Sequence, residues 1–347
     1  MEPQSRITTK QKKDVPRIAV FSTKNWVASA FEEANRQYNY ELTFLEPRLY
    51  AKTARLADEH DVVCAFVNDK VDVPVLEILR ELNVTLVALR CSGFNNVDIK
   101  KAAELGIGVV RVPAYSPHAV AEHTLGMILC LNRKYHKAYL RVRDGNFALD
   151  GLLGFDLYGK TVGIIGTGKI GQILARIMCG MGCKVIGYDK YHNDAFKEIG
   201  GVYVKLHTLY EQSDIISLHC PLTYETYHII NEYAISAMKP GVMIINTSRG
   251  PLIDTAAVIG GLKKGKVGQL GLDVYEEEGE LFFEDLSEQV IQDDTFVRLQ
   301  TFPNVLITAH QAFFTREAIH NIAVTTLDNI GDYLQIGKCV NAVLPRD

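Results

Sequence analysis

Long apolar runs, closely paired cysteines and an excess of basic residues are all absent from this sequence of 347 residues. No apolar run reaches the roughly 18 residues that a membrane-spanning helix requires, which argues against a membrane protein. The seven cysteines are odd in number, include no C-x-x-C pair and lie mostly in apolar runs. This favours the buried, reduced thiols of a cytoplasmic protein over disulfides or a zinc site, and we expect no metal. The net charge of −4 gives no support for a nucleic-acid partner, which usually needs a basic face.

A secretory signal is also missing from the N-terminal segment. Residues 1–17 are polar, carry four Lys or Arg residues between Arg6 and Lys13, and lack the apolar core of such a signal. We expect residues 1–14 to form a disordered tail. What the chain does contain is 47% apolar and 22% charged residues without a low-complexity tract, which is typical of a soluble globular protein of about two domains.

The central feature of the sequence is residues 160–190. An apolar run, 161–165, predicts a buried parallel strand, the residues after it have helical periodicity, and a second apolar run, 184–188, follows. Glycines spaced as G-x-G-x-x-G separate the first strand from the helix, and an aspartate ends the second strand. This order of strand, glycines, helix, strand and acid is the pattern of a dinucleotide-binding βαβ unit.

Each residue of this motif has a physical role. Gly166 permits the tight turn, Gly168 lets a pyrophosphate approach the backbone, and Gly171 lets the helix pack close to the strand. The N–H groups at the helix start and the helix dipole then bind the phosphates. Asp189 can accept hydrogen bonds from both ribose hydroxyls and would repel a 2′-phosphate. The motif therefore predicts NAD rather than NADP as the cofactor.

Strands alternate with helices along most of the chain, which predicts parallel sheets covered on both faces. In the first third the expected strands lie at residues 17–22, 40–44, 61–67, 84–90 and 108–112. Six further strands are expected near residues 161–165, 184–188, 214–218, 242–246, 267–272 and 305–308. Residues 118–139 have the pattern of one long helix, and residues 317–336 that of a last helix with no strand to follow.

The simplest layout returns this last helix to the first domain. We therefore predict an α/β fold of two Rossmann-like parallel-sheet domains. The NAD-binding domain, residues 116–312, is inserted into a flavodoxin-like substrate domain of residues 15–115 and 313–347. Ligands of such sheets bind at the carboxyl ends of the strands, so we expect the active site in the cleft between the domains.

Three strand ends carry candidate catalytic groups. Arg249 follows an apolar strand, where its guanidinium suits a bidentate grip on a carboxylate. His310 lies just past the last strand, where a histidine is a candidate general acid/base. Asp273 ends the strand between them, and of the acidic run 276–278 we expect at least two glutamates to be solvated. Reduction of a 2-oxo acid needs a cation for the carboxylate, a proton donor and a hydride, which Arg249, His310 and NADH would supply. A glutamate beside His310 would keep it protonated and oriented.

Seven motifs along the chain carry a family resemblance. They are LRCSGFNNVD at 89–98, VPAYSPHAVAEHTLGMIL at 112–129, GTGKIG at 166–171, LHCPLT at 218–223, NTSRG at 246–250, DVYEEE at 273–278 and AHQAF at 309–313. From about Ile18 onward the chain resembles the D-2-hydroxyacid dehydrogenase family, in particular its lactate-forming members.

The resemblance implies a role for each site residue. It implies that Arg249 binds and polarises the substrate, that Glu278 rather than Glu276 or Glu277 pairs with the histidine, and that His310 is the acid/base. It implies substrate contacts from Ser92, Gly93, Tyr115 and Phe313. For the cofactor it implies Gly166, Gly168, Lys169, Ile170 and Gly171 at the pyrophosphate turn, Asp189 at the ribose, Cys220 and Pro221 along the adenosine, and Thr247 and Asp273 near the nicotinamide, with Thr226 and Ser248 completing the set.

The implied reaction is the reversible reduction of pyruvate to D-lactate by NADH. A broader reductase of larger 2-oxo acids such as phenylpyruvate is an alternative, because Tyr115 and Phe313 could either crowd a methyl group or stack on a larger side chain. A remote alternative is an NAD-sensing corepressor in which the fold serves protein binding, although the loop 280–301 resembles the lactate type. The apolar surface of the 118–139 helix and the family resemblance predict a homodimer or homotetramer.

Overall fold

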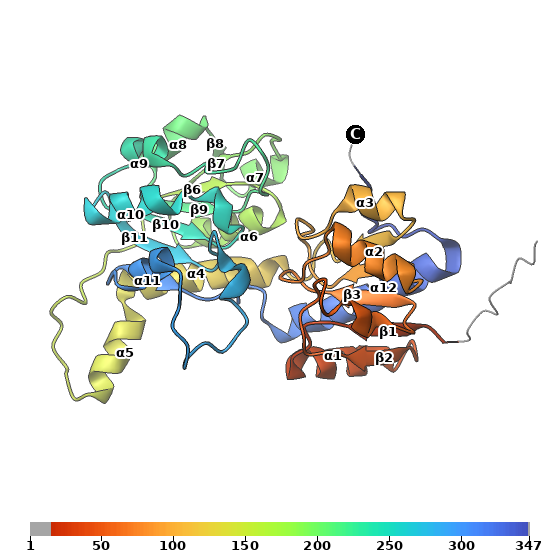
Figure 1. The fold of residues 1–347 in the computed structure, drawn as a ribbon. Helices are drawn as coiled ribbons and strands as arrows, with labels where there is room; N and C mark the ends of the chain where they lie inside the picture. The colour runs from red at the N-terminus through yellow and green to blue at the C-terminus, as the bar shows by residue number, and fades with distance from the viewer. Residues whose placement is uncertain (1–14, 346–347) are drawn as a thin grey trace, which may run out of the picture. The chain divides into compact units, whose positions relative to one another are not determined.

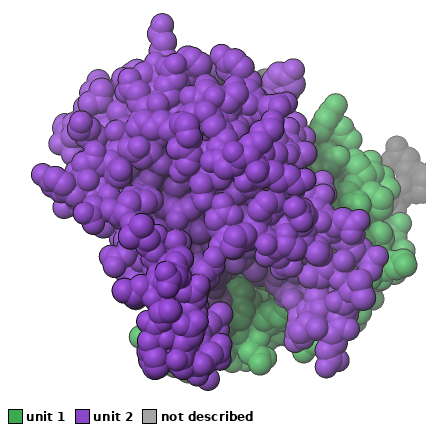
Figure 2. Space-filling view, turned by 90° about the vertical axis from the view of Figure 1, so that its left-hand side faces the viewer, with its two compact units in different colours: residues 1–115, 315–347 green, residues 116–314 purple. Residues whose placement is uncertain are grey.

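The computed structural model describes residues 15–345, so the tail expected at 1–14 lies outside the described residues. The described chain forms two compact units (Figures 1 and 2). Unit 1 comprises residues 15–115 and 315–345, and unit 2 comprises residues 116–314, so the chain leaves unit 1 once and returns to it. None of the helices within residues 15–345 has the length and apolar character needed to cross a membrane.

Unit 1 is built on one five-stranded parallel sheet in the order β2-β1-β3-β4-β5, the order of flavodoxin-like folds. Its strands are β1 (Arg17–Val20), β2 (Glu41–Phe44), β3 (Val62–Ala65), β4 (Leu86–Leu89) and β5 (Gly108–Arg111). Its helices are α1 (Asn25–Asn35), η1 (Ala54–Ala57), α2 (Val73–Glu81), α3 (Ile99–Glu104) and α12 (Arg316–Ile336). Every residue of β3 and β4 is buried, as expected for central strands covered on both faces.

The two faces of this sheet are covered by different helices. Side chains of α1 and α12 pack into the core on one face, and side chains of α2 and α3 pack into the core on the other. The C-terminal helix α12, drawn in blue in Figure 1, therefore completes the domain in which the chain began.

Unit 2 is built on a seven-stranded parallel sheet in the order β12-β11-β10-β9-β6-β7-β8. Its strands are β6 (Thr161–Ile165), β7 (Lys184–Tyr188), β8 (Val202–Tyr203), β9 (Ile215–Leu218), β10 (Val242–Asn246), β11 (Val267–Leu272) and β12 (Val305–Ile307). Counted from β6, this is the 3-2-1-4-5-6 order of dinucleotide-binding folds with one strand added beyond β11. The two parallel sheets and the insertion of unit 2 into unit 1 confirm the predicted fold class.

The helices of unit 2 also divide between the faces of its sheet. They are α4 (Pro117–Arg133), α5 (Tyr135–Arg143), α6 (Lys169–Gly180), α7 (Asp194–Glu198), α8 (Leu206–Gln212), α9 (Glu232–Ala237), η2 (Gly250–Leu252), α10 (Thr255–Lys263), η3 (Glu278–Glu280) and α11 (Asp294–Gln300). One core contains residues of α4, α6 and α7, and the core on the opposite face contains residues of α8 to α11.

Two sequence-based expectations were wrong in unit 2. The stretch 118–139 is not one helix, because Lys134 adopts a left-handed backbone conformation (φ 54°, ψ 38°) that ends α4 and begins α5. The sheet has seven strands rather than six, because the two-residue strand β8 pairs with β7. Val202 of β8 is exposed and the strand contains no apolar run, so the hydrophobic pattern gave no signal for it.

Candidate active and cofactor-binding site

The turn between β6 and α6 fits a pyrophosphate at the backbone. Gly166 has φ +97°, and a Cβ there would lie 2.4 Å from the backbone N of Cys220. A Cβ at Gly171 would lie 2.1 Å from the carbonyl oxygen of Gly166, so α6 packs directly on the turn. At Gly168, by contrast, a Cβ would meet nothing within 4 Å, so the space above this glycine is open for a ligand.

The first residues of α6 complete this turn. Gly168 is the N-cap of the helix and offers no side-chain cap. The first N–H groups of a helix have no partner within it, and the helix dipole makes this end electropositive. The backbone N–H groups of Lys169 and Ile170 are therefore suited to the phosphates of a dinucleotide.

Asp189 is fixed at the carboxyl end of β7. Its Oδ2 accepts from the backbone N–H of Thr167 at 2.7 Å, and its Oδ1 accepts from the N–H of Tyr191 at 3.1 Å. The Thr167 hydroxyl in turn lies 2.7 Å from the hydroxyl of Tyr203 in β8. Because Oδ2 also accepts from the Thr167 hydroxyl at 3.3 Å, Oδ1 is the carboxylate oxygen that keeps a lone pair for a further donor such as a ribose hydroxyl.

The loops after β9 and β10 are held to each other. The Ser248 hydroxyl donates to the carbonyl oxygen of Cys220 at 2.7 Å, and the Thr226 hydroxyl donates to that of Pro221 at 2.7 Å. Burial raises the pKa of the Cys220 thiol to about 12, so this residue stays an uncharged, apolar wall. These contacts fix the backbone of Cys220 and Pro221, which lies beside the glycine turn.

His310 and Glu278 form the central titratable pair. The Nδ1 of His310 lies 2.9 Å from Oε1 of Glu278, and both side chains are mostly buried. The other carboxylate oxygen of Glu278 accepts from the N–H of Tyr275 at 3.0 Å, which fixes its orientation. The rings of Phe283 and Phe313 lie 5.6 and 6.5 Å from the His310 ring between centroids. The pairing leaves Nε2 as the ring nitrogen of His310 that can serve a substrate.

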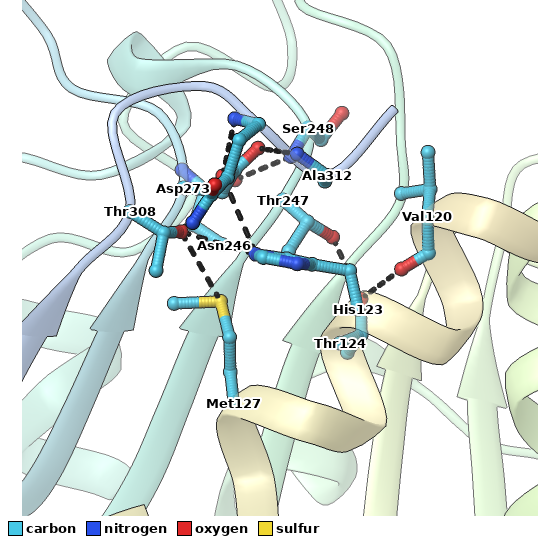
Figure 3. Close-up of polar contacts among 11 residues, drawn as sticks. Val120, His123, Thr124, Met127, Asn246, Thr247, Ser248, Asp273, Thr308 and Ala312 are labelled. Carbon is cyan, nitrogen blue, oxygen red and sulfur yellow. Dashed lines mark hydrogen bonds and ion pairs between the residues drawn. The ribbon is translucent and has the colours of Figure 1, made fainter. Parts of the chain in front are cut away.

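Asp273 supports the turn that carries His310, and Figure 3 shows Asp273 beside Thr308 and Ala312, which lie on either side of His310 in the chain. Its Oδ1 accepts from the Thr308 hydroxyl at 2.7 Å and from the N–H of Gln311 at 2.8 Å, and its Oδ2 accepts from the N–H of Ala312 at 2.9 Å. Burial alone would raise the pKa of this carboxyl, but hydrogen bonds from His123, Thr308 and Ala312 hold it below its ordinary value. Asp273 is therefore an anion whose acceptor sites are filled by the turn around His310.

This turn has an unusual backbone. Both Ala309 (φ 33°) and His310 (φ 56°) have positive φ, a backbone conformation that residues other than glycine and asparagine seldom adopt. The N–H of His310 donates to the carbonyl oxygen of Asp273 at 2.5 Å. Asp273 therefore holds a strained turn with both its backbone and its side chain.

Arg249 follows β10 and the buried residues Asn246 and Thr247. Asn246 donates from its side-chain amide to the carbonyl oxygen of Arg249 at 2.8 Å, and the hydroxyls of Thr247 and Thr124 lie 2.9 Å apart. The Arg249 side chain itself donates to the carbonyl oxygen of Ser248 at 2.6 Å. The backbone of Arg249 is thus anchored. Its side chain is half-buried, and among the described residues the carbonyl oxygen of Ser248 is its one hydrogen-bond partner.

The acidic run does not behave as the sequence suggested. Only Glu277 is exposed; Glu278 pairs with His310, and Glu276 pairs with His228 at 2.7 Å. The expectation that at least two of the three glutamates are solvated was therefore wrong, because two histidines distant in sequence lie opposite them.

The structure adds residues that the sequence analysis missed. His123 of α4 lies 3.1 Å from the Thr308 hydroxyl and 3.4 Å from Oδ1 of Asp273 through its Nε2 (Figure 3). A polar residue on an otherwise apolar helix face was the available signal for His123. For Thr308 the available signal was its position two residues before His310, because alternate side chains of a strand point to the same side.

The expected substrate residues of unit 1 lie after its strands. Ser92 and Gly93 follow β4, where the Ser92 hydroxyl donates to the carbonyl oxygen of Pro113 at 3.3 Å and Arg111 donates to that of Ser92 at 2.8 Å. Tyr115 ends the first part of unit 1, and its carbonyl oxygen accepts from the Asn321 amide of α12 at 2.7 Å. Phe313 belongs to unit 2 and is buried.

Comparison with known proteins agrees with this geometry. Residues 125–312 match the family described as "D-isomer specific 2-hydroxyacid dehydrogenase, NAD binding domain", so the cofactor is NAD. The chain is 56% identical to a 2-hydroxyacid dehydrogenase homolog of Haemophilus influenzae over 95% of this chain and 99% of that protein. It is 52% identical to a D-lactate dehydrogenase of Escherichia coli over 94% of this chain and 100% of that protein.

A solved structure is also similar to this chain over nearly its whole length. The pyruvate reductase of Chlamydomonas reinhardtii is 46% identical, with a TM-score of 0.88 over 92% of this chain and 96% of that one. With the glycine turn, the Asp189 carboxylate and the Glu278–His310 pair in place, these likenesses show that the chain belongs to the D-isomer-specific 2-hydroxyacid dehydrogenase family.

Proposed function

We propose that this protein is an NAD-dependent D-lactate dehydrogenase that catalyses pyruvate + NADH + H⁺ ⇌ D-lactate + NAD⁺. The observation that carries the proposal is the Glu278–His310 pair, held at 2.9 Å on a turn that follows the last strand of the NAD-binding sheet. The D-lactate dehydrogenase of E. coli and the pyruvate reductase of C. reinhardtii are similar over nearly their whole lengths, which supports pyruvate as the substrate.

His310 would act as the general acid in the reducing direction. Bound NADH supplies the hydride for the carbonyl carbon of the substrate. The imidazolium donates its Nε2 proton to the ketone oxygen and, in the reverse direction, the neutral ring accepts the hydroxyl proton. Glu278 accepts a hydrogen bond from the Nδ1–H of the ring and thereby directs the reactive proton to Nε2.

We assign the remaining substrate contacts to Arg249, Ser92, Gly93, Tyr115 and Phe313. Arg249 binds the carboxylate through its planar guanidinium. The backbone N–H groups of Ser92 and Gly93 offer further donors for the carboxylate, and Tyr115 and Phe313 border the methyl group.

The cofactor would be held along the carboxyl ends of the unit 2 strands. Gly166, Gly168, Lys169, Ile170 and Gly171 take the pyrophosphate, and Asp189 takes the ribose hydroxyls. Cys220, Pro221, Thr226 and Ser248 border the adenosine side, and Thr247 borders the nicotinamide. We assign Asp273 to the nicotinamide end as well, although its four protein donors give it first the task of fixing the His310 turn.

Turnover and product chirality test this function. Purified protein should oxidise NADH when pyruvate is added, and the product should be a substrate for a D-specific and not an L-specific lactate assay. His310→Gln should lower kcat by on the order of 10²–10⁴. His207→Gln, at an exposed histidine of α8, is the control and should keep the wild-type rate. Absence of turnover with every 2-oxo acid, or a near-normal rate for His310→Gln, would contradict the proposal.

A broader specificity for larger 2-oxo acids is the second candidate. The observation in its favour is the pair of aromatic rings beside His310, Phe283 and Phe313, which could stack on an aromatic substrate. A panel of 2-oxo acids from pyruvate to phenylpyruvate separates the two candidates by kcat/KM. A maximum at phenylpyruvate would favour the second.

We also propose a homo-oligomer, and the cytoplasmic location stays a prediction. The buried residues of α4 are used within unit 2, so the surface expected on a long 118–139 helix is not available there. Exposed apolar side chains instead gather on α5 and the segment after it, and α5 has no buried residue. A second copy of the chain would cover this surface.

A further inference from the structure

A second histidine–carboxylate pair lies outside the catalytic set. The Nε2 of His228 is 2.7 Å from Oε1 of Glu276, and both side chains are about three-quarters buried. The other oxygen of Glu276, Oε2, accepts from the Thr255 hydroxyl at 2.7 Å and from the Thr255 N–H at 3.2 Å. The Nδ1 of His228 is 4.0 Å from Oδ2 of Asp254. The imidazole thus has one carboxylate at hydrogen-bond distance from Nε2 and a second one farther off on the side of Nδ1. None of these groups has a part in the reaction described above.

These side chains join three segments around the Arg249 loop. The N–H of His228 donates to the carbonyl oxygen of Pro251 at 2.9 Å, and the N–H of Ile230 donates to that of Leu252 at 3.0 Å. Both acceptors lie in η2, which begins at the residue after Arg249. The segment 228–230 therefore flanks one side of the loop that carries the guanidinium.

The other side of the loop rests on the acidic run. A Cβ at Gly250 would lie 1.9 Å from the carbonyl oxygen of Tyr275 and 2.5 Å from the N of Glu276, so the two backbones are in direct contact. The Glu276 side chain then reaches to Thr255 at the end of the loop and to His228 on the far side. One carboxylate therefore ties the flanking segment, the end of the Arg249 loop and the run that carries Glu278.

The backbone of His228 is a second observation that its side-chain contacts hold the residue in one conformation. Its φ is +50°, in the left-handed region that asparagine and glycine adopt with less strain than histidine. The ring stacks on Tyr227 with centroids 3.9 Å apart and an interplanar angle of 16°. Strain of this kind persists where surrounding contacts compensate for it, and the 2.7 Å contact of the imidazole with Glu276 is such a contact.

We propose that the His228–Glu276 pair positions Arg249 for the carboxylate of the 2-oxo acid. The inference rests on the proposed function, in which Arg249 binds that carboxylate. Neither residue touches the reacting atoms. The pair clamps the 250–255 loop between segment 228–230 and the acidic run, so that the guanidinium approaches the substrate in one orientation.

The expected signature is a change in KM without a change in kcat. An interaction that holds substrate and transition state alike lowers KM and leaves kcat unchanged, so its loss should show in KM. His228→Asn should raise KM for pyruvate about tenfold, which corresponds to a loss of about 1.4 kcal/mol of substrate binding. The kcat, its pH profile and the Kd for NADH should stay within about twofold of wild type, because His310, Glu278 and the glycine turn are unchanged.

A conservative variant separates the side chain from the backbone. Gln at 228 carries the same amide as Asn on a chain one methylene longer, so it can reach Glu276, whereas Asn is better suited to the positive φ. Recovery of KM in His228→Gln but not in His228→Asn therefore assigns the effect to the pair. Glu276→Gln should raise KM as well, and the double variant His228→Asn/Glu276→Gln should show less than the sum of the two effects.

Two matched changes serve as controls. Glu277→Gln alters the exposed neighbour in the same acidic run, and His207→Gln breaks an exposed histidine–glutamate pair of 3.4 Å on α8. Both should leave KM unchanged. Binding of oxamate, a non-reducible carboxylate analogue of pyruvate, to the NADH-loaded enzyme should weaken in parallel with KM and gives a readout free of turnover.

The outcomes distinguish this inference from the proposed function. If wild-type protein reduces pyruvate but His228→Asn keeps the wild-type KM, the pair does not position Arg249. If kcat and KM change together, or Gln restores no more than Asn, the pair has only a structural role and the inference is overturned. If wild-type protein reduces no 2-oxo acid, the proposed function itself fails.

Discussion

Asp273 shows how one buried carboxylate can organise a catalytic turn. It receives donors from α4, from Thr308 and from two backbone N–H groups of the residues after His310. These donors keep it ionised despite burial, and they hold Ala309 and His310 in a backbone conformation that would otherwise relax. His310 is thus oriented by Asp273 through its backbone and by Glu278 through its ring.

Replacing Asp273 tests this support. Asn cannot accept at both positions, so Asp273→Asn should leave a donor of the turn unpaired and lower the free energy of unfolding by about 1–3 kcal/mol at neutral pH. The folded-state pKa of Asp273 is lowered, so its stabilisation is fully present above the ordinary aspartate pKa of about 3.9 and is lost progressively as the pH falls from there through the lower folded-state pKa. Urea midpoints of wild type and variant should therefore differ at pH 7 and converge towards pH 3.

The control for this comparison is Asp156→Asn, at an exposed aspartate of the same unit. It should leave the urea midpoint close to wild type at every pH. A gap between wild type and Asp273→Asn that stays constant from pH 7 to pH 3 would show that the charge of Asp273 contributes nothing to stability.

The second prediction at the residue scale concerns Asp189 and the choice between NADH and NADPH. Asp189→Ala removes a carboxylate that the Thr167 and Tyr191 N–H groups hold at the end of β7. Loss of hydrogen bonds to a charged group costs about 1.5–3 kcal/mol, so KM for NADH should rise about 10- to 100-fold, and preference should shift towards NADPH. Asp194→Ala, at an exposed aspartate paired with Lys197, is the control. Equal use of NADPH and NADH by the wild type would show that the interpretation of Asp189 is wrong.

At the scale of elements, strand ends were predictable and loop partners were not. Gly166, Arg249, Asp273 and His310 each follow a run of apolar residues, and parallel sheets collect such positions at one edge. The pairing of Glu276 with His228 could not be read from the sequence, because the two lie 48 residues apart and meet only through the fold. The break at Lys134 was equally hidden, since a left-handed lysine between two helical patterns leaves no glycine or proline as a mark.

The loop after β10 gives an element-scale prediction. In Gly250→Ala the new Cβ would fall 1.9 Å from the backbone oxygen of Tyr275, so one of the two segments must move. Overpacking of this kind costs about 1–3 kcal/mol, and the displaced loop should also raise KM for the 2-oxo acid. Gly260→Ala is the matched control: its Cβ meets nothing within 4 Å inside α10, and alanine there should stabilise by about 0.5–1 kcal/mol. An unchanged urea midpoint for Gly250→Ala would contradict the tight contact.

At the scale of the whole molecule, the two crossovers between the units flank the catalytic parts of unit 2. The chain enters unit 2 at Ser116, the N-cap of the helix that carries His123, and leaves it at Phe314, just after the His310 turn. The His123–Thr308–Asp273 contacts join these two ends within unit 2 (Figure 3). The chain therefore leaves unit 2 directly after a turn that the Asp273 contacts hold in place and that carries the proposed acid/base.

The segment 135–158 is the surface on which we expect two copies of the chain to associate. In Figure 1 α5 and the chain after it, in yellow, extend away from the sheet of unit 2. An isolated helix of nine residues is marginal in water, yet α5 is ordered with only exposed or half-buried side chains. Within this arm, residues 135–158, Arg141 donates to the carbonyl oxygen of Asp150 at 2.7 Å, and the Arg143 guanidinium lies over the Tyr139 ring. We expect a second copy of the chain to cover its apolar side chains.

Replacing three of these side chains by serine should dissociate the oligomer. Phe147, Leu149 and Leu153 are 75%, 81% and 88% exposed, so their loss leaves no cavity in the core and should not unfold the chain. Sedimentation velocity at micromolar concentration should show an oligomer for the wild type and a monomer for the triple variant. The matched control replaces three equally exposed apolar residues near the C-terminal end of unit 1, Ile336, Val340 and Leu344, and should sediment as wild type. A monomeric wild type, or an oligomer that survives the arm substitutions while its far-ultraviolet circular dichroism is unchanged, would exclude the arm as the interface.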